Sequence, residues 1–329
     1  MQEDVAYRSG FIAVVGRPNV GKSTLMNALI GARIAITSSR PETTRKAIRG
    51  VMTGEHYQVV LVDTPGIHRP RTLLGQRLND VVDDSLAEVD AVAFLLPADQ
   101  PIGPGDRRIL ERLREQFGIQ SRDDQARSNQ THDSSAWKIP VIAVLTKIDQ
   151  VSRTQMVEKL IELDQLAQFT QIVPVSALEQ DNLEEVRDVF VAAMPEGPQM
   201  YPDDMLSEET PEDTIAELIR GAFLEELHDE LPHSLAVVVD EIMDPELDDD
   251  GNPVAGPAGK ARVMVSIYVE RDSQKPIIIG KKAEHLVHVK KRLRTAVNRI
   301  VGAKAYLDLH VKVAKEWQSN PKSLERLGF

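Results

Sequence analysis

The sequence predicts an α/β fold in which a doubly wound, mostly parallel sheet is followed by a smaller α+β domain. The first observation behind this prediction is that short apolar runs alternate with helical patterns from residue 10 to about 194. The second is a stretch marked by Pro and Gly at 195–202, after which this alternation stops. The third is length, because 329 residues are enough for about two domains.

The apolar runs of the first part are expected to be buried strands, because a parallel sheet covered on both faces has uninterrupted apolar strands. They lie at 11–15, 57–62, 91–96, 139–145 and 172–175. Apolar residues spaced by three and four predict the helices between them, at 22–29, 73–87, 106–117, 154–167 and 182–193. We therefore expect a tail at 1–9 and a first domain at 10–195, with a polar insertion near 120–135.

The second domain is predicted at 207–329, after a linker at 196–206. Its expected elements are a helix (210–228), two strands (234–242 and 261–269), a short apolar run (277–279), a basic helix to 301, a strand (307–313) and a closing helix (324–329). Residues 200–260, which include an acidic loop near 246–260, carry 18 acidic and two basic side chains. Residues 275–315 carry 11 basic and two acidic side chains, so the charge of this domain is divided.

Composition excludes several kinds of chemistry. The chain has no cysteine, which excludes disulfides, thiolate zinc sites, iron–sulfur clusters and a cysteine nucleophile. Asp and Glu (51) outnumber Lys and Arg (39), so binding to nucleic acid requires a local basic surface. The longest apolar runs, such as 91–96, are far shorter than the roughly 20 residues of a membrane-spanning helix. We therefore expect a cytoplasmic protein with no transmembrane segment.

The strongest motif is GRPNVGKS at 16–23, which fits the pattern G-x-x-x-x-G-K-[ST] and lies between a predicted strand and a predicted helix. Backbone N–H groups of such a P-loop cradle phosphates, and the start of the helix adds a positive dipole. Lys22 is expected to reach the β- and γ-phosphates, and the Ser23 hydroxyl to ligate Mg²⁺. The predicted nucleotide contacts here are Gly16, Arg17, Pro18, Asn19, Val20, Gly21, Lys22, Ser23 and Thr24.

A second motif, DTPG at 63–66, follows the apolar run that ends at Val62. Asp63 is therefore expected at the carboxyl edge of a strand, beside the phosphate loop, where it would hold a Mg²⁺ water. The backbone N–H of Gly66 would meet the γ-phosphate, because a residue without Cβ allows that approach. The nucleotide contacts predicted in this segment are Asp63, Thr64, Pro65, Gly66 and Ile67.

Two further segments predict guanine recognition. The first, TKID, consists of Thr146, Lys147, Ile148 and Asp149 and closes a predicted strand. One carboxylate accepts both N1–H and N2–H₂ of guanine, whereas adenine would leave Asp149 facing a lone pair. An unpaired buried polar group costs roughly 1 to 3 kcal/mol, so adenine nucleotides should bind less well than guanine nucleotides. GTP and GDP are therefore the expected ligands. The second segment, Ser176 and Ala177, follows the last strand, where the N–H of Ala177 is expected to donate to guanine O6. All six residues of these two segments are predicted nucleotide contacts.

These four segments together resemble the nucleotide-binding elements of the translation-factor class of GTPases. The resemblance implies that Thr43 or Thr44 is the switch threonine, and we take Thr44 as the second protein ligand of Mg²⁺. It also implies that the catalytic set is Lys22, Thr44, Gly66 and Asn19, and that the metal site is formed by Ser23, Thr44 and Asp63, of which Asp63 acts through a bound water.

Two positions depart from that class. Thr146 stands where an Asn normally contacts the base and braces the phosphate loop, and its shorter side chain is expected to weaken guanine binding without changing the preference. Ile67 stands where Ras-like enzymes have the Gln that orients the attacking water. The chain therefore resembles hydrophobic-substituted GTPases, in which a bound cation, a repositioned water or a partner completes the site. In that group, an Asn at the position of Asn19 often marks hydrolysis that K⁺ assists, and we state K⁺ assistance as a hypothesis for this chain.

A third resemblance lies in the second domain. The segment IIIGKKA at 277–283, followed by a basic helix, is similar to the I-I-G-x-x-G loop and helix of a type II KH domain, which clamps the backbone of about four nucleotides. Ala283 replaces the second Gly, and because Ala is small and compatible with a helix, we expect it to hinder the RNA only in part. The residues that the resemblance implies in RNA binding are Ile279, Gly280, Lys281, Lys282, Ala283, Lys290, Lys291, Arg292 and Arg294.

With ITSSRPETTR at 36–45, the two domains resemble the bacterial Era family from about residue 9 to the C-terminus. The resemblance implies a GTPase that acts in assembly of the small (30S) ribosomal subunit and binds 16S rRNA through its KH domain. It also implies peripheral contact with the cytoplasmic face of the cell membrane, and we expect a monomer.

Other functions stay open at this point. Ile67 and Thr146 are compatible with an RNA-binding scaffold whose nucleotide domain is only a slow timer. A related GTPase that acts on another RNA, such as tRNA or the large subunit, would share most of these motifs. An ATPase is disfavoured by Asp149.

Overall fold

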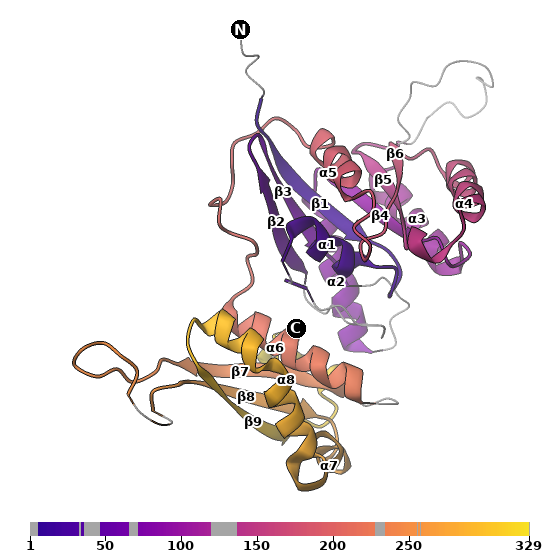
Figure 1. The fold of residues 1–329 in the computed structure, drawn as a ribbon. Helices are drawn as coiled ribbons and strands as arrows, with labels where there is room; N and C mark the ends of the chain where they lie inside the picture. Colours follow the sequence, from indigo (N-terminus) through magenta and orange to yellow (C-terminus); the bar gives the residue numbers. More distant parts are fainter. Residues whose placement is uncertain are drawn as a thin grey trace, which may run out of the picture. The chain divides into compact units, whose positions relative to one another are not determined.

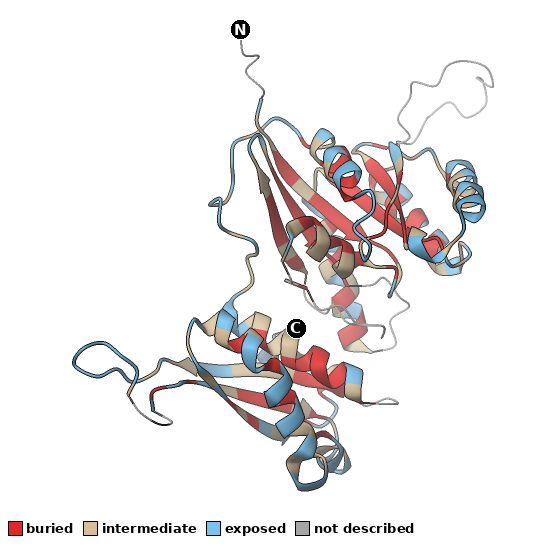
Figure 2. Ribbon diagram, in the orientation of Figure 1, coloured by how far each residue is buried: buried red, intermediate tan, exposed pale blue. Residues whose placement is uncertain are grey.

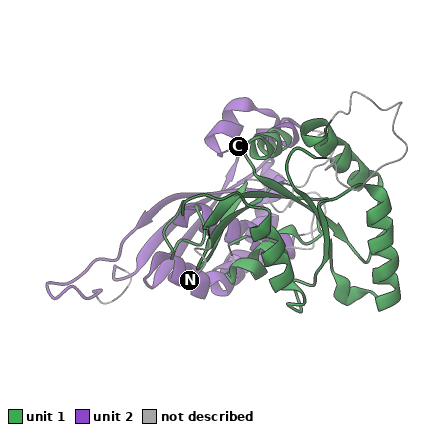
Figure 3. Cartoon of the chain, turned by 90° about the horizontal axis from the view of Figure 1, so that it is seen from above, with its two compact units in different colours: residues 1–35, 44–69, 78–208 green, residues 36–43, 70–77, 209–329 purple. Residues whose placement is uncertain are grey.

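The computed structural model describes residues 6–32, 34–35, 47–65, 72–119, 137–227, 234–254, 256 and 258–328. Contacts divide the chain into two compact units, which Figure 3 draws in different colours. Unit 1 contains residues 1–35, 44–69 and 78–208, and unit 2 contains residues 36–43, 70–77 and 209–329. Within the described part of the chain, no helix combines the length and the apolar character needed to cross a membrane.

Among the described residues, the sheet of unit 1 has six strands: β1 (Arg8–Val15), β2 (Ile48–Gly54), β3 (Tyr57–Asp63), β4 (Ala91–Pro97), β5 (Val141–Thr146) and β6 (Gln171–Pro174). Their order is β2-β3-β1-β4-β5-β6 (Figure 1). All neighbouring pairs are parallel except β2 with β3. The mostly parallel sheet that the sequence predicts is therefore confirmed.

Helices cover both faces of this sheet: α1 (Lys22–Ile30), α2 (Leu73–Ala87), α3 (Pro104–Phe117), α4 (Arg153–Leu166) and α5 (Leu183–Ala192). Side chains of α1 and α5 form one hydrophobic cluster with strand residues such as Ile12 and Val14. Side chains of α2, α3 and α4 form a second cluster with the alternate strand residues, such as Ala13 and Val15. Figure 2 shows the buried strands between these helices. Because both faces are covered, the strands need uninterrupted apolar sequences.

Strand β2 differs from the prediction, which places no strand at 48–54. Its sequence, IRGVMTG, contains Gly50 and Gly54, and glycine is a poor strand former. In the structure β2 nevertheless pairs with β3 along its whole length, in antiparallel register from Ile48 opposite Asp63 to Gly54 opposite Tyr57. Pairing with a neighbouring strand therefore overrides the weak local preference.

The segment 196–208, most of which is the predicted linker, runs along β2 and β3. The amide of Gln58 in β3 is fully buried. It donates to the carbonyl oxygen of Tyr201 at 3.0 Å and accepts two backbone N–H groups of the same segment at 2.8 Å each. Further along, the N–H of Val51 donates to the carbonyl oxygen of Leu206 at 2.9 Å. The otherwise open edge of β2 is thereby covered, as edge strands of monomeric domains often are.

Unit 2 consists of α6 (Pro211–Glu226), β7 (Ala236–Met243), β8 (Ala261–Val269), α7 (Lys275–Ile279), α8 (Glu284–Val301), β9 (Ala305–Val313) and α9 (Pro321–Arg326), together with short 3-10 turns. Its strands lie in the order β7-β8-β9, with β8 antiparallel to β7 and parallel to β9. Apolar side chains of α6 and α8, such as Phe223 and Leu293, pack with Val265 of β8 in one core. From α6 to β9 the order is α-β-β-α-α-β, which is the predicted smaller α+β domain.

Candidate functional site

The predicted nucleotide motifs meet at one edge of the sheet of unit 1. Because β1, β3, β4, β5 and β6 are parallel, their carboxyl ends lie at the same edge (Figure 1). Residues 16–24 follow β1, residues 63–65 lie at the end of β3, residues 146–149 lie at the end of β5, and residues 176–177 follow β6. β1 lies between β3 and β4, and open α/β sheets bind ligands where the chain crosses over in opposite directions.

The phosphate loop connects β1 to α1, which begins at Lys22. Gly21 has a φ of +105°, a conformation that residues with a Cβ atom rarely adopt. Asn19 also has a positive φ, of 64°. A turn of this kind gathers backbone N–H groups at the positive end of the helix, which is an arrangement that binds anions.

The side chain of Lys22 lies inside this loop and is only 8% exposed. Its Nζ is 3.4 Å from the carbonyl oxygen of Gly16 and 3.5 Å from that of Arg17. Burial lowers the pKa of Lys22, and the nearby carboxylate of Asp63 opposes this effect. Both carbonyl contacts are long, so a phosphate oxygen would provide a much better partner for the ammonium group.

Two residues of the predicted metal site, Ser23 and Asp63, contact each other directly. The Ser23 hydroxyl donates a hydrogen bond to Asp63, with 2.6 Å between Oγ and Oδ2. Asp63 is fully buried at the end of β3. Thr64 Oγ1 donates to the carbonyl oxygen of Val14 at 3.0 Å, which holds the chain after β3 against β1. Hydroxyl and carboxylate oxygens are the ligands that Mg²⁺ prefers, so this pair fits the predicted metal site.

Thr146 braces the phosphate loop. Its hydroxyl donates to the carbonyl oxygen of Val20 at 2.6 Å, and it also lies 3.3 Å from the carbonyl oxygen of Leu96. Thr146 is itself buried, so water does not compete for this contact. The shorter side chain that replaces the usual Asn therefore keeps the connection to the phosphate loop.

Asp149, the residue predicted to read guanine, is oriented by Ser176. The Ser176 hydroxyl donates to the Asp149 carboxylate, with 2.6 Å between Oγ and Oδ1. The same Oγ accepts the backbone N–H of Glu179 at 3.2 Å. Ser176, a predicted nucleotide-site residue, thus contacts the side chain of Asp149, and its position after the last strand brings it here.

The loop between β4 and α3, together with the first turn of α3, makes contacts that the sequence motifs do not reveal. Arg17 Nε lies 2.7 Å from Asp106 Oδ1, and Asp106 is fully buried. The other carboxylate oxygen of Asp106 accepts the N–H of Gly103 at 2.8 Å, at the start of α3. In the same loop, Asp99 Oδ2 lies 3.8 Å from Lys147 Nζ. The first turn of α3 therefore contacts the phosphate loop, and the loop before it contacts the base-recognition segment.

Three predicted nucleotide-site residues, Thr44, Gly66 and Ile67, lie outside the described residues. The chain that leads toward Thr44 is anchored to α1 by Asn27. Its Nδ2 donates to the carbonyl oxygen of Ala35 at 2.8 Å, and its Oδ1 accepts the N–H groups of Ile34 and Ala35 at 3.0 and 2.9 Å.

In unit 2, the predicted RNA loop joins α7 to α8. At Gly280, where φ is +74°, a Cβ atom would lie 2.9 Å from the backbone nitrogen of His285. Lys281 and Lys282 are exposed, and Lys282 and Ala283 both have positive φ values, of 53° and 64°. The helix compatibility of alanine does not apply at Ala283, because the residue adopts a left-handed conformation that is strained for alanine, and its partial hindrance of the RNA stays a prediction.

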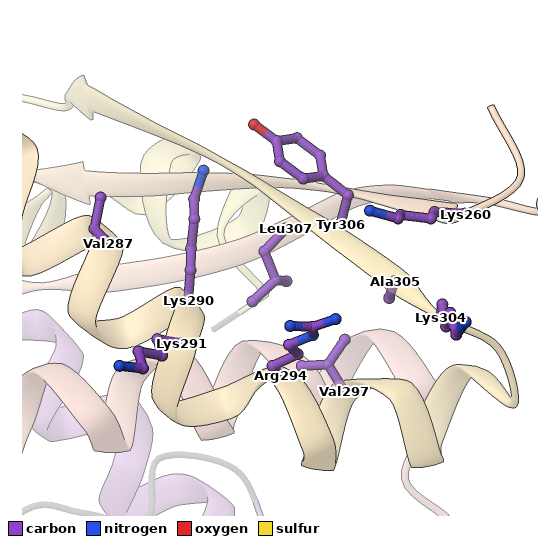
Figure 4. A pocket seen from close by; sticks show the side chains of 10 residues that line it. All are labelled: Lys260, Val287, Lys290, Lys291, Arg294, Val297, Lys304, Ala305, Tyr306 and Leu307. Carbon is purple, nitrogen blue, oxygen red and sulfur yellow. The ribbon is translucent and has the colours of Figure 1, made fainter. Parts of the chain in front are cut away.

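The basic residues of α8 face different surroundings. Lys290, Lys291 and Arg294 line a pocket of about 340 Å³ between α8 and β9 (Figure 4). Arg292 instead forms an ion pair with Glu225 and lies 3.9 Å from Glu226, and both of these residues belong to α6. The structure therefore brings three of the four predicted helix residues together and ties Arg292 to α6.

Three polar residues of this basic pocket are not among those predicted from the sequence: Lys260, Lys304 and Tyr306. Tyr306 is the second residue of β9, and Lys260 directly precedes β8. The alternation of Leu307 and Leu309 in the last strand is the one signal available in the sequence, since it directs the even-numbered residue 306 away from the core.

Family models match both parts of the chain. The model described as "50S ribosome-binding GTPase" matches residues 11–147, and the model described as "KH domain" matches residues 230–318. GTPase Era of Mycolicibacterium paratuberculosis is 49% identical over 324 residues, which cover 98% of this chain and 99% of that relative. GTPase Era of Mycobacterium bovis is 48% identical with the same coverage.

Two solved structures share this fold over nearly the whole chain. An Aquifex aeolicus Era variant bound to GDP.AlF4- matches with a TM-score of 0.84 and 31% identity, over 98% of this chain and 99% of that chain. Era in complex with MgGDPNP and nucleotides 1506–1542 of 16S ribosomal RNA matches with a TM-score of 0.83 and 32% identity, at the same coverage. The chain is a GTPase with a C-terminal KH domain and belongs to the Era family.

Proposed function

We propose that this chain is a GTP-hydrolysing switch that binds 16S ribosomal RNA during assembly of the small ribosomal subunit. The observation that carries the proposal is the basic pocket lined by Lys290, Lys291 and Arg294, because it lies in the part of the chain that matches a KH domain. The relative solved with MgGDPNP and nucleotides 1506–1542 of 16S ribosomal RNA supports the choice of RNA. In this proposal the domains are 10–195 and 207–329, joined by the linker 196–206.

The proposed nucleotide contacts of the first domain combine the contacts described above with the predicted roles of Thr44 and Gly66, which lie outside the described residues. Backbone N–H groups of residues 16–21 and the ammonium group of Lys22 hold the phosphates, and Lys22 stabilises negative charge as the γ-phosphate leaves. Asp149, oriented by Ser176, accepts the N1–H and N2–H₂ groups of guanine. Thr44 and Gly66 contact the γ-phosphate side of the site, so their segments are released after hydrolysis.

Mg²⁺ fits the pair formed by Ser23 and Asp63, whose oxygen atoms lie 2.6 Å apart. We assign Ser23 and Thr44 as its ligands and Asp63 as the residue that holds one of its waters. When bound, the ion neutralises negative charge on the phosphates. K⁺ beside Asn19 is a separate proposal: replacing K⁺ with Na⁺ should slow hydrolysis, and an unchanged rate would contradict it.

Single-turnover GTP hydrolysis with isolated ribosomal subunits tests the proposed role. We expect 30S subunits to accelerate hydrolysis more than 50S subunits do. Acceleration by 50S subunits alone would instead favour a GTPase of the large subunit, which is the class that the matching family model describes. A negligible rate that neither subunit changes would favour a scaffold with a slow timer.

RNA binding through the KH loop is tested with Lys281→Ala combined with Lys282→Ala. Loss of two phosphate contacts should weaken binding to an RNA that spans nucleotides 1506–1542 and should reduce the salt slope by about 1.4. Lys138→Ala combined with Lys322→Ala removes two other exposed lysines and is the matched control. An equal effect of both double variants would argue against the loop as the RNA contact.

Peripheral membrane contact, a cytoplasmic location and a monomeric state stay predictions of the resemblance. Flotation of the purified protein with anionic lipid vesicles tests the first, and sedimentation tests the last.

A further inference from the structure

Tyr306 lies between two pockets of unit 2. The first is the basic pocket of about 340 Å³ beside α8. The second has a volume of about 680 Å³, and its lining includes Asp244, Glu246, Lys260 and Arg262 together with Tyr306. Because Tyr306 and Lys260 line both, a strand held in the first pocket continues into the second by crossing the tyrosine.

The ring of Tyr306 is suited to stacking against a nucleobase. Tyr306 is 51% exposed, although large aromatic residues are usually covered in a domain core. Lys290 Nζ lies 5.0 Å from the ring centroid, and Figure 4 shows Lys260, Lys290 and Tyr306 along the same side of the basic pocket. Exposed aromatic rings flanked by cations bind single-stranded nucleic acid, since the ring stacks a base while the cations hold the backbone.

The walls of the second pocket differ in charge. Lys260 lies on the side that is shared with the basic pocket, whereas Asp244 and Glu246 add two carboxylates. Arg262 forms an ion pair with Asp308, so its charge is already balanced. Ionised carboxylates accept hydrogen bonds only, and they repel phosphate. A phosphate therefore belongs beside Lys260, and a base edge beside the carboxylates has to carry hydrogen-bond donors.

This requirement distinguishes among the bases. Cytosine N4, adenine N6 and guanine N2 are amino groups that donate hydrogen bonds. An amino group has two N–H donors and can serve both carboxylates, whereas uracil has a single ring N–H on its pairing edge, flanked by two carbonyl oxygens, and can donate to only one carboxylate. The pocket is therefore suited to a base that carries an exocyclic amino group and unsuited to uracil.

We propose that the second pocket holds one amino-bearing base of the bound RNA, stacked on Tyr306, with its amino group toward Asp244 and Glu246 and its phosphate beside Lys260. The proposal rests on the proposed function, because it requires that unit 2 binds RNA. It adds a binding site beyond the loop at 280–283 and a preference against uracil at one position of the RNA.

Variants of Tyr306 test the stacking contact. With an RNA spanning nucleotides 1506–1542 as the probe, Tyr306→Ala should weaken binding by about 5- to 150-fold. Tyr306→Phe keeps the ring and should bind within about twofold of the unchanged protein. Thermal unfolding of both variants establishes that each is folded before binding is compared. Equal affinities for Tyr306→Ala and Tyr306→Phe, with both folded, would overturn the proposal.

The base preference is tested by replacing the bases of the probe with uracil one at a time. At one position, uracil should weaken binding to the unchanged protein about tenfold or more. The same replacement should change the affinity of the double variant Asp244→Asn, Glu246→Gln much less, because its neutral amides also donate hydrogen bonds. The same loss in both proteins at every position would rule out recognition by the carboxylates.

These outcomes separate the proposal from the function on which it rests. If the unchanged protein does not bind the probe, the proposed RNA binding fails. If it binds and the two Tyr306 variants bind equally, RNA binding stands and the proposed base site is wrong.

Discussion

The hydroxyl of Thr146 donates a hydrogen bond to the carbonyl oxygen of Val20 across 2.6 Å, and so connects the base-recognition segment to the phosphate loop. Both residues are almost completely buried, so the carbonyl would have no water to replace a lost donor. Loss of a buried hydrogen bond of this kind costs about 1 to 3 kcal/mol.

We therefore predict that Thr146→Val, which keeps the shape and removes the donor, weakens GDP binding about 10-fold. Thr146→Ser keeps the hydroxyl and should bind nearly as well as the unchanged protein. Equilibrium titration with a fluorescent GDP analogue measures both. Equal affinities of the Val and Ser variants would show that the brace does not contribute to binding.

The ion pair between Arg17 and Asp106 should position the phosphate loop. Asp106→Asn removes a charged partner from a fully buried site, and hydrogen bonds to charged groups contribute about 1.5 to 3 kcal/mol. We expect a higher KM for GTP and weaker GDP binding. Arg17→Ala should have a similar effect, and the double variant should be little worse than either single one, because both remove the same contact. Arg108→Ala, an exposed change on α3, is the control. If the loss of GDP affinity in the double variant equalled the sum of the two single losses, Arg17 and Asp106 would not act through a shared contact.

Asp149→Asn should change the base that is bound. An amide presents a donor where guanine requires an acceptor, whereas xanthine has a carbonyl at position 2 that accepts from an amide. The variant should lose GTP binding by 100-fold or more, on the order expected when a polar contact to the base is left unpaired, and should gain affinity for xanthosine triphosphate. Competition between the two nucleotides measures the change. A variant that still prefers GTP would remove Asp149 from base recognition.

Tyr201 should make the stability of unit 1 depend on alkaline pH. Burial and a hydrogen bond from the Tyr201 hydroxyl to Glu208 raise the pKa of Tyr201 from 10.0 to about 12. The folded state keeps this proton at pH values where the unfolded chain has lost it. The contribution of Tyr201 is therefore complete below about pH 10 and falls as the pH rises toward about 12.

Urea unfolding of the protein and of Tyr201→Phe at several pH values tests this expectation. Phe cannot ionise, so Tyr201→Phe should not lose this contribution at alkaline pH. Above about pH 10, the free energy of unfolding of the unchanged protein should therefore fall relative to that of the variant. A difference that is constant from neutral to strongly alkaline pH would mean that the two states titrate alike.

Ala283→Gly should stabilise unit 2. Ala283 has a φ of 64°, where a left-handed conformation costs an alanine roughly 1 to 2 kcal/mol. Glycine avoids this cost but loses about 0.4 to 1 kcal/mol through the greater freedom of the unfolded chain. We expect a net gain of about 0.5 to 1 kcal/mol in the free energy of unfolding. Ala303→Gly, at a position without a positive φ, should instead destabilise. Destabilisation by both changes would contradict the strain at Ala283.

The sequence by itself determined the fold class, the nucleotide motifs and the resemblance to the Era family. These features are local: buried strands are continuous apolar runs, helices repeat apolar residues at three and four, and each motif is a few adjacent residues at the end of a predicted strand. The parallel sheet then brings those strand ends to one edge, which is why the sequence alone predicts that the motifs lie together.

Only the tertiary structure decided which side chains complete these sites. Thr146 and Val20 are 126 residues apart in the chain, and Arg17 and Asp106 are 89 residues apart. Strand β2, which the sequence does not indicate, exists because β3 offers it a partner. Arg292 pairs with Glu225 of α6, whereas Lys290, Lys291 and Arg294 line the basic pocket, and this difference depends on how α8 packs against α6. Contacts of this kind join residues that no local pattern connects, because they are selected by the packing of whole elements and not by the preferences of neighbouring residues.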